Sequence, residues 1–195
     1  EVGPEVTKVK PGDRVTSETT FQTCGVCPYC KTRDYNLCSN RRGIGTQQNG
    51  SMAEYVLSRE ESVHLLPDSV DLLPAALSEP LACAVHASIE KGDVQPGEVV
   101  CIFGAGAIGL MLAQVAKSRG ATVILAGLSN DTQRFGIARC FGVDRTVDQQ
   151  AEDLAEVVRE MTGGVGVDTA FEASGAVPAV NKALEIVRKK GKVIQ

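Results

Sequence analysis

The chain has 195 residues, of which 43% are apolar, so it can bury one large core or two small ones. Its formal net charge is −4, and its lysines and arginines form no basic stripe, which argues against a nucleic-acid surface. No apolar stretch reaches the roughly 20 residues needed to span a bilayer, which argues against a membrane protein. Seven cysteines without a visible signal peptide predict free thiols and a cytoplasmic location.

The first 65 residues mix short alternating runs with turn sequences, a pattern typical of an irregular all-β segment. The turn residues at 49–50 predict a strand over residues 51–56. From Leu72 the pattern becomes helical, with Pro80 in a first-turn position, where its missing N–H costs nothing. Because a residue before proline is disfavoured in helical dihedrals, Glu79 is expected at a break between two helical pieces.

After Gly97 strands and helices alternate regularly. We expect strands at 99–103, 122–126, 145–148, 167–173 and 192–195, and helices at 108–117, 132–140, 150–161 and 177–190. This alternation predicts an α/β fold, a doubly wound parallel sheet of the Rossmann type that lacks its last strand. The basic run at 188–190 is interpreted as the end of the last helix, where it complements the negative end of the helix dipole.

Four cysteines, Cys24, Cys27, Cys30 and Cys38, form a C-x2-C-x2-C-x7-C run. Thiolates at this spacing can converge on one zinc ion at about 2.3 Å, and four protein ligands leave no open position, so the zinc is expected to be structural. A disulfide pair is disfavoured by the odd number of cysteines and the reducing context. An iron–sulfur cluster is disfavoured because the C-x3-C-P ending of bacterial ferredoxins is absent.

A G-x-G-x-x-G sequence, whose last four residues are Gly106, Ala107, Ile108 and Gly109, starts at Gly104 directly after an apolar strand and opens a helix. In this context the glycines allow a tight turn, a close approach of the backbone to a pyrophosphate, and close packing of helix on sheet. The sequence therefore predicts a dinucleotide site. A glycine-rich turn that binds another ligand, such as a methyl donor, is the alternative.

The second strand of this fold normally ends in a carboxylate that binds the adenosine ribose of NAD. Here the strand ends at Gly127, with no carboxylate before Asp131. Gly127 leaves room for a 2′-phosphate, and Ser129 and Arg134 could donate to its oxygens, so NADP is slightly favoured over NAD. Two observations keep the choice open, since Asp131 could reach a ribose and Arg134 could be a solvated helix residue.

Taken together, these sequences resemble the zinc-dependent medium-chain dehydrogenases, on the sorbitol (polyol) and threonine dehydrogenase side. The resemblance is carried by the cysteine run and the glycine loop together with the sequences at 2–6, 9–15, 52–56, 79–82 and 171–175. It implies a partial GroES-like catalytic domain over 1–75 with its zinc lobe at 24–38, linker helices over 76–92 and a truncated NAD(P)-binding domain over 93–195. The chain therefore resembles an internal fragment.

The same resemblance implies roles for further residues. Glu79 would lie at a catalytic zinc as a direct or water-linked partner, and Ala173, Ser174 and Gly175 would lie against the ribose and nicotinamide end of the cofactor. The other ligands of that zinc are absent from this sequence, since its two histidines are better explained as packed or capping residues. As it stands, the chain is expected to be inactive.

For the parent protein the resemblance implies hydride transfer between NAD(P) and a secondary alcohol or polyol. It also implies a homo-oligomer, either a dimer or a tetramer. Two alternatives stay open at this point. One is a non-catalytic, zinc-stabilised nucleotide-binding module, and the other is a zinc-free NADPH-dependent reductase of the quinone type, against which the cysteine run argues.

Overall fold

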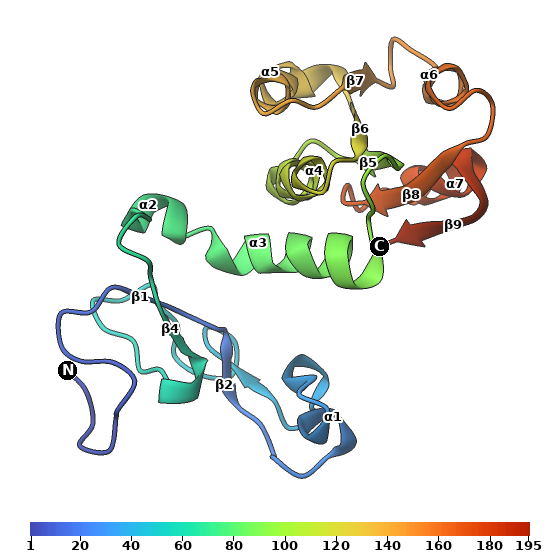
Figure 1. Ribbon diagram of the computed structural model, residues 1–195. Helices are drawn as coiled ribbons and strands as arrows, with labels where there is room; N and C mark the ends of the chain where they lie inside the picture. Colours follow the sequence, from blue (N-terminus) through green and yellow to red (C-terminus); the bar gives the residue numbers. More distant parts are fainter. The chain divides into compact units, whose positions relative to one another are not determined.

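The computed structural model describes every residue from Glu1 to Gln195, and the chain divides into two compact units, Glu1–Glu79 and Pro80–Gln195 (Figure 1). The first unit contains the cysteine run and the second contains the glycine loop. Across both units, no helix combines the length and the apolar character needed to cross a membrane.

The first unit is built from four short strands joined by long irregular segments. They are β1 (Val15–Ser17), β2 (Thr20–Gln22), β3 (Arg42–Gly43) and β4 (Val63–Leu65). β1 pairs with β4 and β2 with β3, both antiparallel. Helical turns at α1 (Pro28–Lys31), η1 (Tyr35–Leu37), η2 (Glu60–Ser62) and α2 (Leu72–Ala75) complete the unit. The irregular segment with short strands expected from the sequence is present, but the strands are short and helical turns lie between them.

The predicted strand over 51–56 was wrong, because this segment has no strand pairing. Met52 and Tyr55 in it are fully or largely exposed, so no packed face selects an extended, paired conformation.

Polar contacts hold the irregular segments of the first unit together. Arg14 donates to the carbonyl oxygens of Pro67 and Val70 at 3.1 and 2.9 Å. Glu60 accepts from the backbone N–H groups of Lys8 and Thr7, each at 2.5 Å, and these bonds hold the pKa of Glu60 below its ordinary value. A unit with so few ladder hydrogen bonds relies on such side-chain bonds to satisfy its backbone.

The second unit is an open five-stranded parallel sheet in the order β7-β6-β5-β8-β9. The strands are β5 (Val99–Phe103), β6 (Thr122–Gly127), β7 (Arg145–Asp148), β8 (Val167–Glu172) and β9 (Val187–Ile194). The chain steps outward from β5 through β6 to β7, then crosses to β8 on the other side of β5. This order is that of a doubly wound sheet, so the predicted fold class is confirmed.

Helices cover both faces of this sheet (Figure 1). Along β5, Val100 and Ile102 point into one apolar core, while Cys101 and Phe103 point into the other. Helices α4 (Ala107–Ser118) and α5 (Thr132–Cys140) contribute to the first core, and α6 (Leu154–Met161) and α7 (Val177–Ile186) to the second. Burial raises the pKa of the Cys101 thiol far above its ordinary value.

Helix α3 (Ser78–Val85) continues into a π-helical turn, η3 (His86–Lys91). Ala84 of this helix is fully buried in the same core as α4, so most of the helical segment expected as a linker packs with the second unit.

Two helix boundaries differ from the sequence-based expectation by a full turn or more, the start of α6 and the end of α7. Helix α6 begins at Leu154 rather than at 150, because Asp153 caps it by accepting from the N–H of Ala155 at 2.9 Å. Helix α7 ends at Ile186, and the basic run at 188–190 lies in β9 instead of closing a helix, so that interpretation was wrong. There Arg188 donates to Asp168 of β8 at 2.6 Å, which anchors the run to the sheet.

The carboxylate of Asp144 holds the residue that precedes β7 against β6 and α4. Asp144 accepts from the N–H of Val123 at 2.7 Å and from the ammonium of Lys117 at 2.8 Å. Burial raises the pKa of Asp144, but the lysine and the N–H outweigh it and hold the pKa below its ordinary value.

Candidate functional site

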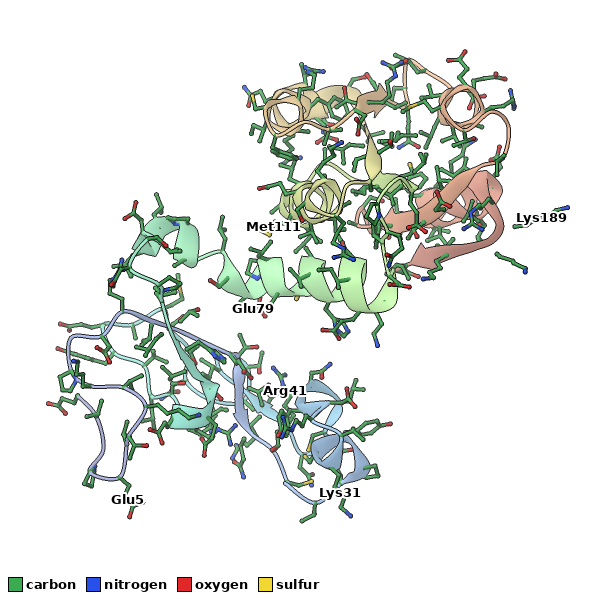
Figure 2. All side chains as sticks on the ribbon, in the orientation of Figure 1. Glu5, Lys31, Arg41, Glu79, Met111 and Lys189 are labelled. Atoms are coloured by element: carbon green, nitrogen blue, oxygen red, sulfur yellow. The ribbon has the colours of Figure 1, made fainter.

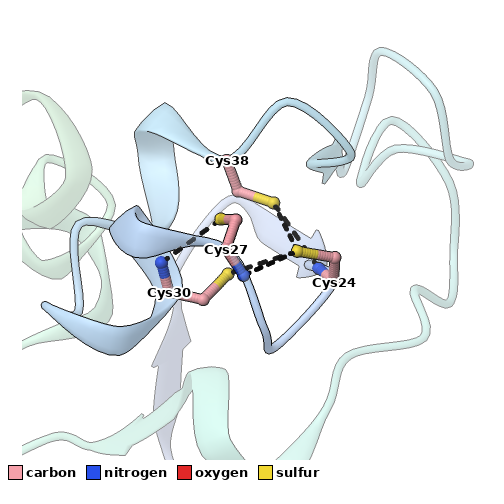
Figure 3. Close-up of side chains that lie close together, drawn as sticks. All are labelled: Cys24, Cys27, Cys30 and Cys38. Carbon is pink, nitrogen blue, oxygen red and sulfur yellow. Dashed lines mark hydrogen bonds between the residues drawn. The ribbon is translucent and has the colours of Figure 1, made fainter.

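The four cysteines of the predicted zinc lobe converge at one point of the first unit (Figure 3). Their sulfur atoms all lie within 4.8 Å of one another, and Cys24 Sγ is 3.7 Å from Cys38 Sγ and 4.0 Å from Cys30 Sγ. A tetrahedral zinc with Zn–S bonds of about 2.3 Å requires sulfur–sulfur distances of about 3.8 Å. The quartet therefore matches the size of a four-thiolate zinc site.

The backbone around the quartet donates to its sulfur atoms. The N–H groups of Cys24, Cys27 and Cys30 donate to the sulfurs of Cys38, Cys24 and Cys27 at 3.5, 3.4 and 3.4 Å. Gly25, at φ +73°, provides the turn that aims the Cys27 N–H back at Cys24. Such outer donors orient metal-binding thiolates and stabilise their charge.

The quartet needs a cation to ionise completely. Backbone N–H groups of Val26 and Cys27 lower the pKa of Cys24 to about 6. The Cys30 N–H lowers the pKa of Cys27, but burial and the neighbouring sulfurs outweigh it and raise that pKa to about 11. Four sulfurs this close cannot all carry charge by themselves, so the donor set fits a thiophilic dication such as zinc.

Glu79 lies in the first turn of α3, where its side chain is exposed (Figure 2). The helical break falls at residues 76–77, before Ser78, so the expectation of a break at Glu79 itself was wrong. Pro80 is in the first turn, as predicted. The cysteine quartet is the one group of three or more potential ligands in the chain, and Glu79 alone does not form a zinc site.

Both histidines are bonded to carboxylates on the surface. His64 Nε2 lies 2.9 Å from Glu18, and His86 Nδ1 lies 2.8 Å from Glu90 one helical turn away. Their side chains are about half exposed, so they are paired rather than packed in a core.

The glycine loop connects β5 to α4 at the carboxyl edge of the sheet. Gly104 has φ +96°, and a Cβ added at Gly109 would overlap the carbonyl oxygen of Gly104, so both positions require glycine. Gly106 precedes the first turn of α4, and a Cβ there would meet no atom within 4 Å. Ala107 and Ile108 are exposed in that first turn.

These features fit the pyrophosphate of a dinucleotide. The first N–H groups of a helix have no hydrogen-bond partners within the helix. At the start of α4 they come directly after Gly106, where the backbone carries no side chain and the space beside it is open to a ligand.

The glycine loop touches the loop that follows β8. A Cβ on Gly104 would come within 3.0 Å of the Ala173 carbonyl oxygen and of Ser174 Cα, and the N–H of Ala173 donates to the carbonyl of Phe103 at 2.9 Å. β5 and β8 are the neighbours at which the strand order reverses, where open α/β sheets bind their ligands. The structure thus brings the predicted residues at 104–109 and 173–175 together.

The predicted phosphate donors at the end of β6 are already bonded to carboxylates. Arg134 pairs with Asp131 at 2.7 Å, and the hydroxyl of Ser129 donates to Asp148 at 2.6 Å. The expected room at Gly127 is taken as well, since a Cβ there would lie 2.8 Å from Asp131 Oδ2. The expectation of open space at this position was therefore wrong.

Two acidic residues at this edge of the sheet were assigned no role from the sequence. Asp148 ends β7 and Glu172 ends β8. The available signal was their position, because each is the last residue of a strand whose carboxyl end lies at the predicted ligand edge.

Two family models match the chain. The alcohol dehydrogenase GroES-like domain matches residues 1–68, and the zinc-binding dehydrogenase model matches residues 107–195. The chain belongs to the zinc-dependent medium-chain dehydrogenase family.

Among curated relatives, the chain is 57% identical to D-arabitol-phosphate dehydrogenase of Enterococcus avium and 52% identical to sorbitol dehydrogenase of Halalkalibacterium halodurans. Both matches cover all of this chain but only 55% and 57% of the relatives, so the chain spans little more than half of their length.

A solved structure described as a zinc-binding dehydrogenase of Sinorhizobium meliloti 1021, bound to NADP, superposes with a TM-score of 0.91 at 34% identity. The match covers 99% of this chain and 56% of that one.

Proposed function

We propose that this chain is part of a zinc-dependent dehydrogenase that transfers hydride between a nicotinamide dinucleotide and a secondary alcohol or polyol. The observation that carries the proposal is the combination of two sites in one chain. In the first unit, four cysteine sulfurs lie at the distances that a four-thiolate zinc site requires. In the second unit, a glycine loop follows β5 at the point where the strand order of the doubly wound sheet reverses. The named relatives, a polyol-phosphate and a polyol dehydrogenase, support the same reaction.

In this proposal the second unit binds the dinucleotide. Gly104, Gly106 and Gly109 shape the loop, and the backbone at Ala107 and Ile108 donates to the pyrophosphate at the start of α4. The residues of the 173–175 loop lie against the ribose and nicotinamide end. The cofactor supplies the hydride chemistry, and this chain's part is to bind and orient it.

Between the two dinucleotides, the end of β6 favours NAD. A 2′-phosphate there would approach the carboxylates of Asp131 and Asp148, while Arg134 and Ser129 already pair with them. A ribose hydroxyl could instead donate to Asp148, which suits NAD. This reverses the slight preference for NADP that the sequence predicts. Gly127, Ser129 and Arg134 would then shape the site indirectly.

The cysteine quartet would hold a structural zinc that orders the 24–38 segment, since all four positions are filled by protein. Glu79 is proposed to lie at the catalytic zinc of the complete protein. Because this chain offers no further ligand beside it, we derive no chemical step through that ion from these residues.

The alcohol is proposed to be a polyol, and a polyol phosphate is the second candidate. The identity of 57% to an arabitol-phosphate dehydrogenase, against 52% to a sorbitol dehydrogenase, favours testing both.

The test is a rate measurement on the full-length protein. D-arabitol, sorbitol, their phosphates and L-threonine are each offered with NAD and with NADP, and nicotinamide absorbance is followed. We expect turnover with at least one polyol or polyol phosphate, faster with NAD. Absence of any absorbance change across the panel, in protein that contains zinc, would refute the proposed reaction.

A further inference from the structure

Glu172 is a buried carboxylate at the carboxyl end of β8, with only 8% of its surface exposed. No lysine or arginine of the chain forms an ion pair with it. Its register partner on β5 is Phe103, the residue immediately before the glycine loop. A buried carboxylate is costly unless hydrogen-bond donors compensate it, so its partners identify what it does.

The donors all come from the loop that follows. Glu172 Oε1 accepts from the N–H of Ser174 at 2.7 Å, from the Ser174 hydroxyl at 2.5 Å and from the N–H of Gly175 at 3.1 Å. The Gly175 N–H also lies 3.2 Å from Oε2. The Ser174 hydroxyl in turn accepts from the N–H of Ala176 at 3.2 Å. The carboxylate thus holds Ser174 and Gly175 directly, and Ala176 through the Ser174 hydroxyl.

This arrangement decides which backbone groups the loop can offer to a ligand. Because the N–H groups of Ser174 and Gly175 are used by Glu172, they are not free to bind a phosphate. The carbonyl oxygens of the loop are left as acceptors, and acceptors recognise hydroxyl groups such as those of a ribose. The loop touches the glycine loop at Gly104, so such a ribose would adjoin the pyrophosphate site.

We infer that Glu172 is a positioning residue for the dinucleotide. It holds the 173–175 loop in the conformation that binds the ribose on the nicotinamide side, without itself touching the substrate. This inference rests on the proposed function and deepens it by naming the buried carboxylate that sets the conformation of this loop.

Removing the carboxylate releases the loop. In Glu172→Ala the two N–H groups lose their acceptor, and the loop must relax to find others. In Glu172→Gln an amide oxygen at the Oε1 position still accepts from the N–H groups of Ser174 and Gly175, while the amide nitrogen cannot accept the second contact of Gly175 at the Oε2 position. The glutamine variant therefore keeps part of the network and carries the test if the alanine variant does not fold.

The experiment compares two ligands on the full-length protein and its variants. Dissociation constants are measured for NADH by fluorescence and for 5′-AMP by calorimetry, with Glu156→Gln as control, because that carboxylate is exposed on α6 and pairs only with Arg159. For Glu172→Ala we expect the NADH constant to rise roughly 10- to 100-fold and the 5′-AMP constant to change less than about threefold. Glu172→Gln should show a smaller rise in the same direction, and the control none.

An equal rise for both ligands would assign Glu172 to general stability and overturn the inference, as would an NADH constant that does not change. Wild-type protein that binds neither ligand would overturn the proposed function and this inference together. Wild-type binding of both ligands with unchanged variants would overturn the inference alone.

Discussion

Replacement of Cys38 by serine tests the zinc lobe most directly. Cys38 Sγ lies 3.7 Å from Cys24 Sγ and accepts from the Cys24 N–H, so its loss removes one of four ligands and one backbone anchor. We expect the variant to contain one zinc per subunit fewer than the wild type and its 24–38 segment to unfold locally.

The magnitude follows from how little else holds this segment. Only Cys30 and Cys38 are buried in it, and Val26 and Leu37 are 73% and 54% exposed. Burying the side chains of Cys30 and Cys38 contributes at most about 4 kcal/mol. Ordering the backbone of the segment costs on the order of 15–30 kcal/mol. Structural zinc supplies about 10–16 kcal/mol in small peptides, so the metal decides whether the segment is ordered.

The assay combines zinc analysis with limited proteolysis and hydrogen exchange. Cys83→Ser is the matched control, because Cys83 is an exposed cysteine on α3 outside the quartet. The control should keep its zinc and its protease resistance. If Cys38→Ser keeps both as well, the quartet does not hold the metal and the reasoning is refuted.

Three further predictions concern the second unit. Gly109→Ala places a methyl group against the Gly104 carbonyl oxygen, so it should lower the free energy of unfolding by about 1–3 kcal/mol and remove most of the NADH affinity. Gly136→Ala is the control, because a Cβ there meets no atom within 4 Å, and it should stabilise α5 by about 0.5–1 kcal/mol. Thermal melts and NADH titration check both variants. Asp148→Asn should raise the preference for NADP over NAD roughly tenfold, measured as a ratio of kcat/KM values. The pKa of Asp144 is lowered in the folded state, so this carboxylate stabilises the fold above its unfolded pKa, and the stabilisation is lost as the pH falls through its folded pKa. In Asp144→Asn the free energy of unfolding should therefore depend less on pH on the acid side. Chemical denaturation at several pH values measures this.

The inner strands of the sheet were predictable because each carries its own signal. The apolar run at 99–103 and the strand at 145–148 have the bounds expected from the sequence. Buried parallel strands need apolar residues on both faces, and this composition is visible locally.

The errors lie where another part of the chain decides the outcome. The last helix was predicted to continue through the basic run, but Arg188 is drawn into the sheet by Asp168 of a neighbouring strand. The segment 51–56 has the composition of a strand and finds no strand to pair with. Propensity alone does not report such partners.

The same division applies to the candidate site. Cys24, Cys27, Cys30 and Cys38 are close in sequence, so their spacing predicted a cluster that the structure assembles. The carboxylate of Asp148, by contrast, reaches Ser129 only because β6 and β7 are adjacent. That contact is the basis for proposing NAD instead of the NADP suggested by Ser129 and Arg134.

The seven thiols of the chain lie in such different environments that a thiol reagent should modify them in three separate stages. Cys83 and Cys140 are exposed and should react with a thiol reagent in the native protein. The quartet should become reactive when a chelator removes its metal. Cys101, fully buried in β5 with a raised pKa, should react only when the sheet itself unfolds. The kinetics of labelling with one thiol reagent would thus report metal loss and global unfolding separately.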